Sequence, residues 1–385
     1  MTLNLDPEEL ASCVQCGLCL SHCPTFRVTG DESMSPRGRI ALMRKVEEGA
    51  PITAEVKRSF ETCVQCRGCE TACPSGVKYG HLMEQTREAL AERHEITPVW
   101  QRVALGALDH PRLLSAGSTA LGVAQRVKLV PKRLGLPRIP MRSKPLKDSA
   151  GSPLGDVYLF TGCVMDAWQR DVHRDLQYVL EQAGYGVIPT TNASCCGALH
   201  THAGLGNRSR AMATNVMNAL VGNHPIIVDS AGCGAAMKEY GQLLGTDEAE
   251  AFSLRVFDAA EWLVEHPGNL NSSEVLDLRV AVQDPCHLRH VQRVHLATRD
   301  LLRPFVRELV ELDDEGLCCG AGGSYSALEP EMAGLIRERK VASIDRAKPD
   351  VVASANPGCS MHLQAAGVRS VHPISLVAQA LRRAE

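Results

Sequence analysis

The spacing of the cysteines constrains this chain more than any other feature. Near the N-terminus four cysteines are spaced C-x-x-C-x-x-C-x-x-x-C and precede a proline, and the same run recurs fifty residues later. The eight residues are Cys13, Cys16, Cys19, Cys23, Cys63, Cys66, Cys69 and Cys73. In paired runs of this kind, three thiolates bind one iron–sulfur cube and the fourth binds the other. The sequence therefore predicts two [4Fe–4S] clusters.

The fourth cysteine of each run is expected to cross to the other cluster. This gives one cluster to Cys13, Cys16, Cys19 and Cys73. It gives the second cluster to Cys63, Cys66, Cys69 and Cys23. A structural zinc site usually shows two C-x-x-C pairs separated by a loop, and a disulfide scaffold needs an oxidising compartment. Neither alternative accounts for the whole spacing occurring twice.

Composition limits the classes of partner. A chain of 385 residues has room for two or three domains. Its net charge of −3 and its 4% aromatic residues argue against nucleic-acid binding. The first ten residues lack the features of a signal peptide, and no apolar segment is long enough to span a bilayer. With sixteen cysteines in a reducing compartment, we expect a cytoplasmic protein, with peripheral contact to the inner face of the cell membrane as an open alternative.

The segments around the second cysteine run are predicted to be helical. Ser35 and Pro36 suit the N-cap and first position of a helix that ends near Gly49. A second short helix carries Val56 and Phe60. A third helix follows the second run, with a stripe formed by Tyr79, Leu82, Met83, Thr86 and Leu90. This pattern favours an all-α helical ferredoxin module.

Two arginines between the cysteine runs allow two interpretations. Arg37 and Arg39 lie near Asp31 and Glu32 in the sequence, so they can form an ion-paired surface. Alternatively, their positive charge lies near a cluster and raises its reduction potential.

After residue 155 an α/β pattern occurs twice. In each copy a strand ends at a cysteine, and thirty-one residues separate that cysteine from a Cys-Cys-Gly motif. The first copy contains Cys163, Cys195, Cys196 and Cys233. The second contains Cys286, Cys318, Cys319 and Cys359. The repeat indicates an internal duplication with parallel sheets, whose cysteines gather at one edge.

These patterns predict a multidomain chain. The expected units are a helical two-cluster module at 1–98, a helical and basic linker at 99–154, and α/β cysteine-rich repeats at 155–270 and 271–385. The linker has eight Lys or Arg and no Asp or Glu between 126 and 147, so it is either solvated or touches anionic lipid.

Other cofactor motifs are missing. No segment completes a P-loop or a G-x-G-x-x-G fingerprint, so nicotinamide or flavin binding by this chain is not expected. Four histidines lie close to the cysteine motifs and are either packed residues, ligands or proton relays. They are His200, His202, His287 and His290.

The order of the motifs resembles that of glycolate oxidase (glycolate dehydrogenase) iron–sulfur subunits. Short runs such as C-V-Q-C-G-L-C, S-P-R-G-R-I and N-P-G-C are similar to theirs, and the resemblance extends from about Leu10 to the C-terminus. It implies that a partner subunit carrying FAD oxidises a 2-hydroxy acid, glycolate or D-lactate. This chain would pass the electrons to an acceptor such as quinone. More distantly, it is similar to the cysteine-rich subunits of heterodisulfide reductase.

In heterodisulfide reductase the cysteine-rich motif ends in C-x-x-C, whereas here Ala236 and His362 occupy the last position. Imidazole can replace thiolate as an iron ligand, so a third cluster is expected in the second repeat. Its ligands would be Cys286, Cys318, Cys319, Cys359 and His362. A less favoured site uses Cys163, Cys195, Cys196 and Cys233. The alternative for this site is that the repeats bind no metal. The alternatives for the function of the chain are a disulfide-reducing catalytic subunit and a structural or sensing iron–sulfur protein.

Overall fold

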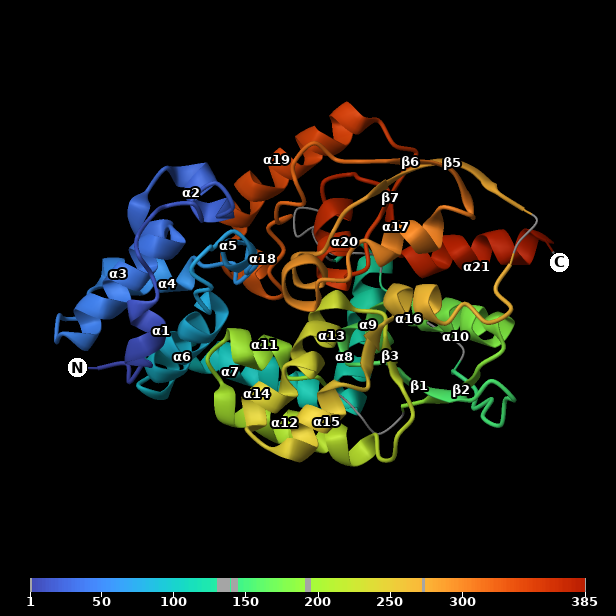
Figure 1. Ribbon diagram of the computed structural model, residues 1–385, viewed down its shortest axis with the longest axis horizontal. Coiled ribbons are helices and arrows are strands. Elements are labelled where there is room, and N and C mark those ends of the chain that lie inside the picture. Colours follow the sequence, from blue (N-terminus) through green and yellow to red (C-terminus); the bar gives the residue numbers. More distant parts are fainter. Residues whose placement is uncertain (1, 130–138, 140–144, 191–194, 272–273, 385) are drawn as a thin grey trace.

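The computed structural model describes residues 2–129, 139, 145–190, 195–271 and 274–384. Helices make up the regular structure in the described residues before β1 (Figure 1). They are α1 (Pro7–Ala11), α2 (Pro24–Thr29), η1 (Glu32–Met34), α3 (Pro36–Glu47), α4 (Ala54–Glu61), α5 (Gly68–Thr71), α6 (Tyr79–Glu92), α7 (Val99–Gly106), η2 (Ala107–Asp109) and α8 (Pro111–Arg126).

The three helices predicted around the second cysteine run are present as α3, α4 and α6. Helix α3 begins as expected, because Ser35 Oγ accepts a hydrogen bond from the Gly38 N–H over 3.0 Å and Pro36 occupies the first position. These helices bury one shared core that includes Met43, Phe60, Leu82, Met83 and Leu90. The core holds the two cysteine-bearing loops against each other.

Two four-stranded parallel sheets follow. The first has the order β2-β1-β3-β4 and consists of β1 (Asp156–Phe160), β2 (Gly186–Pro189), β3 (Ile226–Val228) and β4 (Val256–Asp258). The second has the order β6-β5-β7-β8 and consists of β5 (Leu276–Val282), β6 (Val306–Val310), β7 (Val351–Ala353) and β8 (Ser370–Val371). The matching strand order is the structural form of the duplication seen in the sequence.

Helices surround both sheets. Those of the first repeat are α9 (Val164–Trp168), α10 (Arg170–Ala183), α11 (Ala198–His202), α12 (Gly206–Ala219), α13 (Ala231–Lys238), α14 (Tyr240–Leu244), α15 (Asp247–Ser253) and α16 (Ala259–Glu265). Those of the second are the π-helical segment η4 (His287–Gln292), α17 (Ala297–Leu302), α18 (Tyr325–Leu328), α19 (Pro330–Ala347), α20 (Pro357–Gln364) and α21 (Pro373–Ala384).

The two repeats share one apolar core. Side chains such as Leu176 on α10 and Leu263 on α16 pack in the same cluster as Leu302 on α17 and Val377 on α21. In Figure 1 these four helices lie together between the two sheets, while the helical module occupies the opposite end of the molecule. The shared core fixes the carboxyl ends of both sheets relative to each other.

The predicted linker is only partly described. Its first half forms α7, η2 and α8, whereas most of the basic stretch lies outside the described residues. None of the helices in the described ranges is long and apolar enough to cross a membrane.

Candidate functional site: two thiol hollows and a cysteine-lined cavity

The two N-terminal cysteine runs fold into loops of matching conformation. Gln15 and Gln65 have positive φ angles of 59° and 56°, and two positions later Gly17 and Arg67 have φ angles of 86° and 59°. Such left-handed residues are uncommon outside glycine, and turns that contain them aim backbone N–H groups into a concave site. Each loop therefore offers amide hydrogens together with its thiols.

The structure brings together both predicted sets of four thiols. One hollow is lined by Cys13, Cys16, Cys19 and Cys73, and also by Cys69 of the other predicted set. A second hollow is lined by Cys23, Cys63, Cys66 and Cys69. Burial raises the pKa of Cys23 and Cys69, so thiolates crowded here need a cationic partner. The iron of a cluster held by these residues would supply that charge, and the donor set fits it.

The two arginines between the runs have different environments. Arg37 Nε donates to Glu32 Oε1 over 2.6 Å at the surface. Arg39 is fully buried; its Nε donates to Ser59 O over 2.7 Å, and its guanidinium lies 3.9 Å from Cys23 Sγ. Arg37 forms a surface ion pair and also lines the first hollow, where its Nη1 donates to Gln15 O over 3.1 Å. Arg39 is the buried charge beside the second set of thiols.

A larger cavity of about 680 Å³ lies between the two repeats. Eight cysteines line it, namely Cys163, Cys195, Cys196, Cys233, Cys286, Cys318, Cys319 and Cys359. The expected gathering of these cysteines at one edge of the sheets is confirmed. Val64 and Gln65 of the helical module also line it, so three parts of the chain contribute to the cavity.

In the second repeat the thiols form a continuous group. Hydrogen-bonding contacts link them in the order Cys286, Cys318, Cys319 and Cys359. His362 lies one turn beyond Cys359 on α20, and its Nε2–H donates to the Ala333 carbonyl over 3.2 Å. With the proton on Nε2, Nδ1 carries a lone pair that can bind a metal. A backbone carbonyl that holds the other ring nitrogen is the usual second partner of a metal-bound histidine.

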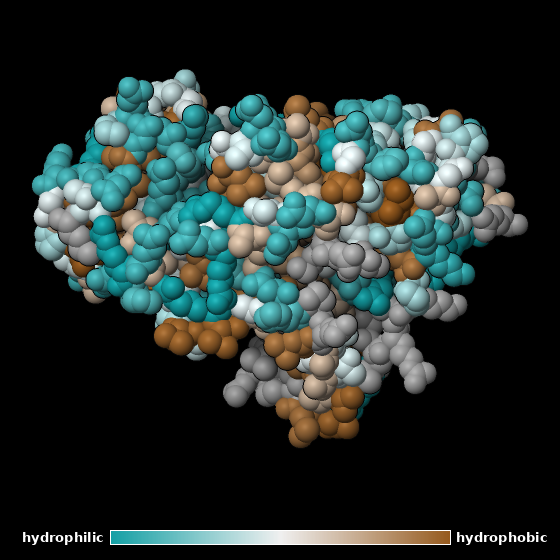
Figure 2. Space-filling view, turned by 90° about the horizontal axis from the view of Figure 1, so that it is seen from below, coloured by the Kyte–Doolittle hydropathy of each residue, from teal (hydrophilic) through white to brown (hydrophobic). Residues whose placement is uncertain are grey.

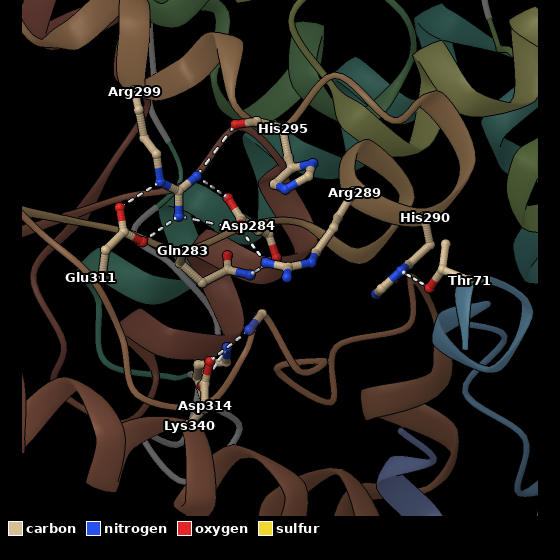
Figure 3. Close-up of polar contacts among 11 residues, drawn as sticks. Thr71, Gln283, Asp284, Arg289, His290, His295, Arg299, Glu311, Asp314 and Lys340 are labelled. Carbon is tan, nitrogen blue, oxygen red and sulfur yellow. Dashed lines mark hydrogen bonds and ion pairs between the residues drawn. The ribbon is translucent and has the colours of Figure 1, made fainter. Parts of the chain in front are cut away.

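An ion-pair network anchors the loop that carries Cys286 (Figure 3). The Asp284 side chain is 2% exposed and accepts hydrogen bonds from Arg289 Nη1 over 2.9 Å and from Arg299 Nη1 over 2.7 Å. Arg299 also pairs with Glu311 at 2.6 Å. Because a buried carboxylate needs such partners, the network fixes the backbone two residues before Cys286.

The first repeat forms a similar group. Cys163 Sγ lies 3.5 Å from Cys195 Sγ, and Cys196 contacts both Cys195 and Cys233. A buried pair adjoins it, since His173 Nδ1 lies 2.6 Å from Asp229 Oδ2 and Asp229 also lines the cavity. All four cysteines line the cavity.

The second N-terminal hollow touches the cavity. Cys66 forms a hydrogen bond with Cys318, which lowers the pKa of the Cys66 thiol. Beside it, Gln65 Nε2 donates to His202 O over 3.0 Å, and His287 Nε2 donates to Gln65 O over 3.1 Å. No motif in the sequence predicts the contact between Cys66 and Cys318, because it joins residues more than 200 positions apart.

The four histidines near the cysteine motifs differ in what they contact. The rings of His202 and His287 meet edge to face with centroids 5.4 Å apart, and both line the cavity. His290 Nδ1 lies 2.8 Å from Thr71 Oγ1 and ties η4 to α5 (Figure 3). His200 is buried beside Cys195.

Among the described residues, no three Cys, His, Asp or Glu side chains converge as the ligands of a single metal ion would. The thiolates of a cluster bind different iron atoms, so a cluster does not require such convergence. The arrangement is thus compatible with a cluster at each group of thiols.

Comparisons with known proteins match this geometry. The 4Fe-4S dicluster domain family matches residues 9–77, and the Cysteine-rich domain family matches residues 157–238 and 280–364. The chain is 33% identical to the Glycolate oxidase iron-sulfur subunit of Escherichia coli (strain K12) over 97% of this chain and 95% of that protein. The chain belongs to the family of glycolate oxidase iron–sulfur subunits.

Two further relatives show the breadth of this family. The chain is 32% identical to the Probable glycolate oxidase iron-sulfur subunit of Bacillus subtilis (strain 168), over 98% of this chain and 95% of that protein. It is 27% identical to one subunit of the Dihydromethanophenazine:CoB--CoM heterodisulfide reductase of Methanosarcina acetivorans, over 97% of this chain and 94% of that protein. Similarity over nearly the full length thus extends from glycolate oxidase subunits to a heterodisulfide reductase.

Proposed function

We propose that this chain is the iron–sulfur electron-transfer subunit of a flavin-dependent 2-hydroxy-acid dehydrogenase, with glycolate as the leading substrate and D-lactate as the second. The observation that carries this proposal is the contact between Cys66 and Cys318. It joins a hollow of four thiols to a cavity lined by eight. FAD would lie on a partner subunit, since this chain completes no dinucleotide fingerprint.

The residues of this chain would hold the clusters and set their potentials. When bound, [4Fe–4S] clusters accept and release single electrons. The two crossed sets of four cysteines supply the thiolates. Arg39 places a positive charge beside the second set, and Tyr79 OH donates to Cys63 Sγ over 3.6 Å. Positive charge and hydrogen bonds to sulfur both raise a cluster's reduction potential.

The different exposure of the two hollows indicates the direction of electron transfer through the chain. Cys16 is exposed, as are Val14 and Leu18 beside it, and the second hollow lies deeper, against the cavity. We place the flavin partner at the Cys13–Cys19 loop. Electrons would then pass to the second set, to the second repeat, and on to an acceptor such as quinone.

The second repeat is proposed to hold a third cluster on Cys286, Cys318, Cys319, Cys359 and His362. The lone pair on Nδ1 of His362 supports this assignment. Replacing His362 with Ala should lower the iron content of the anaerobically purified chain and remove one EPR signal. Signals from the two N-terminal sites should persist. Unchanged iron in H362A would remove His362 from the ligand set.

Peripheral membrane contact is proposed for the linker on the cytoplasmic face of the membrane. Helix α7 exposes Val99, Trp100 and Val103, and separate hydrophobic patches are visible on the face seen from below (Figure 2). The eight basic residues between 126 and 147 would attract anionic lipid.

The proposed domains of the chain are the helical module at 1–98, the linker at 99–154, and the two cysteine-rich repeats at 155–270 and 271–385.

A second candidate function is disulfide reduction in the cysteine-lined cavity. The relationship to a heterodisulfide reductase favours it, whereas the missing fifth cysteines at Ala236 and His362 argue against it. Purification of the native complex without oxygen separates the two functions. Co-purification of a protein that contains FAD supports electron transfer. A chain that purifies without flavin and reduces disulfides alone would contradict it.

A further inference from the structure

His200 is a buried histidine without a hydrogen-bond partner among the described residues. It lies on α11 and is 0% exposed, and neither ring nitrogen forms a hydrogen bond of normal geometry. Buried polar side chains are nearly always paired, and leaving one unpaired costs about 1–3 kcal/mol. Apart from the Cys195 thiol that the imidazole adjoins, neither nitrogen has a partner among the described residues, which points to a further partner from outside the described part of the chain.

The imidazole adjoins the thiols of the first repeat. Hydrogen bonds from Cys163 and Cys196 lower the pKa of the Cys195 thiol, and His200 contributes to the same shift. Cys196 in turn contacts Cys233. The four thiols line the cavity, and the His200 imidazole lies beside one of them, Cys195, outside the residues that line it.

A carboxylate lies close by. Asp109, in η2, is near enough to His200 to interact with it electrostatically, and its Oδ1 is also buried with no hydrogen-bond partner in the described ranges. A metal-bound histidine commonly directs its second ring N–H to a carboxylate. The Asp109 carboxylate is therefore available to accept a hydrogen bond from the His200 ring nitrogen that does not bind the metal.

The two repeats place their histidines at different positions. His200 stands five residues after Cys195, where the second repeat has Gly323 five residues after Cys318. Conversely, His362 stands three residues after Cys359, where the first repeat has Ala236. Each repeat thus has a histidine near its four cysteines at a position where the other repeat has none, and these two histidines lie on different helices.

We propose that His200 is a metal ligand and that, with Cys163, Cys195, Cys196 and Cys233, it forms an iron–sulfur site in the first repeat. Four thiolates alone would place a large negative charge in a buried position. A neutral imidazole adds a donor without adding charge, and it raises the potential of a cluster relative to thiolate. This site is independent of the identity of the hydroxy acid and of the partner subunit.

The test uses the full chain, purified without oxygen and labelled with ¹⁵N-histidine. His362→Ala serves as the background, so that His362 contributes no signal. Pulsed EPR of the reduced chain should show a ¹⁵N coupling from a histidine bound to iron. Adding His200→Ala should abolish the coupling and lower the iron content, while the signals of the N-terminal clusters persist.

A matched control is His202→Ala. His202 lies two residues away and also has a ring nitrogen unpaired within the described ranges, but it packs against His287, so its replacement should keep both iron and coupling. His200→Cys should retain iron and lower the potential of the site. If H200A fails to fold, the coupling in the H362A chain still decides the question. Absence of a histidine coupling there, or unchanged iron in a folded H200A variant, would overturn the proposal.

Discussion

At the scale of single residues, a buried positive charge near a cysteine sulfur has the clearest predicted effect, which is on the reduction potential of a cluster. Arg39 lies 3.9 Å from Cys23 Sγ and is fully buried. Removing its charge should stabilise the oxidised form of the cluster that we propose on Cys23, Cys63, Cys66 and Cys69. We therefore expect Arg39→Gln to lower the reduction potential of that cluster. An EPR-monitored redox titration measures the change.

Arg37→Gln is the matched control for this substitution. Arg37 lies two positions away and pairs with Glu32 at the surface, where solvent screens its charge. Its replacement should leave the potential of the Cys23-containing cluster unchanged. Equal shifts in the R37Q and R39Q chains, or no shift in either, would show that burial of Arg39 does not tune the cluster.

At the scale of elements, α10 is joined to the end of β3 by a buried ion pair. His173 and Asp229 are 0% and 1% exposed, and His173 Nε2 also lies 2.9 Å from Thr161 O. Burial alone would lower the pKa of His173, but Asp229 outweighs it and the pKa is raised. Replacing His173 with Ala leaves a buried carboxylate unpaired, so stability should fall by about 3–5 kcal/mol.

The Tm of H173A, measured by scanning fluorimetry, checks this expectation. Arg174→Ala is the control, because Arg174 is the next residue on α10 and forms an exposed pair with Asp171. An exposed pair of this kind contributes about 0–1 kcal/mol. Similar Tm values for H173A and R174A would contradict a structural role for the buried pair.

The N-cap of α16 should make stability depend on pH. Asp258 is buried, caps the helix, and lies near Glu261 and Lys238. Burial raises its pKa from 3.8 to about 7. The folded chain then binds this proton more tightly than the unfolded chain, so stability falls as pH rises from about 4 to about 7.

Asp258→Asn keeps a good capping residue and removes this titration. The Tm of D258N minus that of the unaltered chain should therefore be more positive at pH 8 than at pH 5. Scanning fluorimetry of both proteins at the two pH values measures it. A difference that stays constant or becomes more negative at pH 8 would contradict the raised pKa.

Local signals in the sequence predicted those elements that carry caps or apolar runs. Ser35 and Pro36 predict the start of α3, and the apolar run Ile226–Val228 is typical of a buried strand such as β3. Strands β4, β6 and β8 are not predicted by such a run. Two of these have only two or three residues, and β6 exposes Arg307 and Glu308 at the sheet edge, so none shows a clear apolar pattern.

At the scale of the whole molecule, the decisive contacts join distant segments. The thiol spacing predicted the two N-terminal sets and the eight cysteines of the repeats. It did not predict that Cys66 meets Cys318 or that Arg39 turns inward, because these contacts depend on tertiary packing, in the first case of the helical module on the second repeat. Tyr325 OH, which donates to Thr62 O over 3.1 Å, belongs to that interface.

The central claim is that electrons from an oxidised 2-hydroxy acid reach the clusters of this chain. The most direct measurement is freeze-quench EPR of the anaerobic complex with its flavoprotein after mixing with glycolate, with D-lactate as the second substrate. We expect cluster signals to appear after flavin reduction, and the isolated chain to show none with either substrate. Flavin reduction in an intact complex without any cluster signal would contradict the claim.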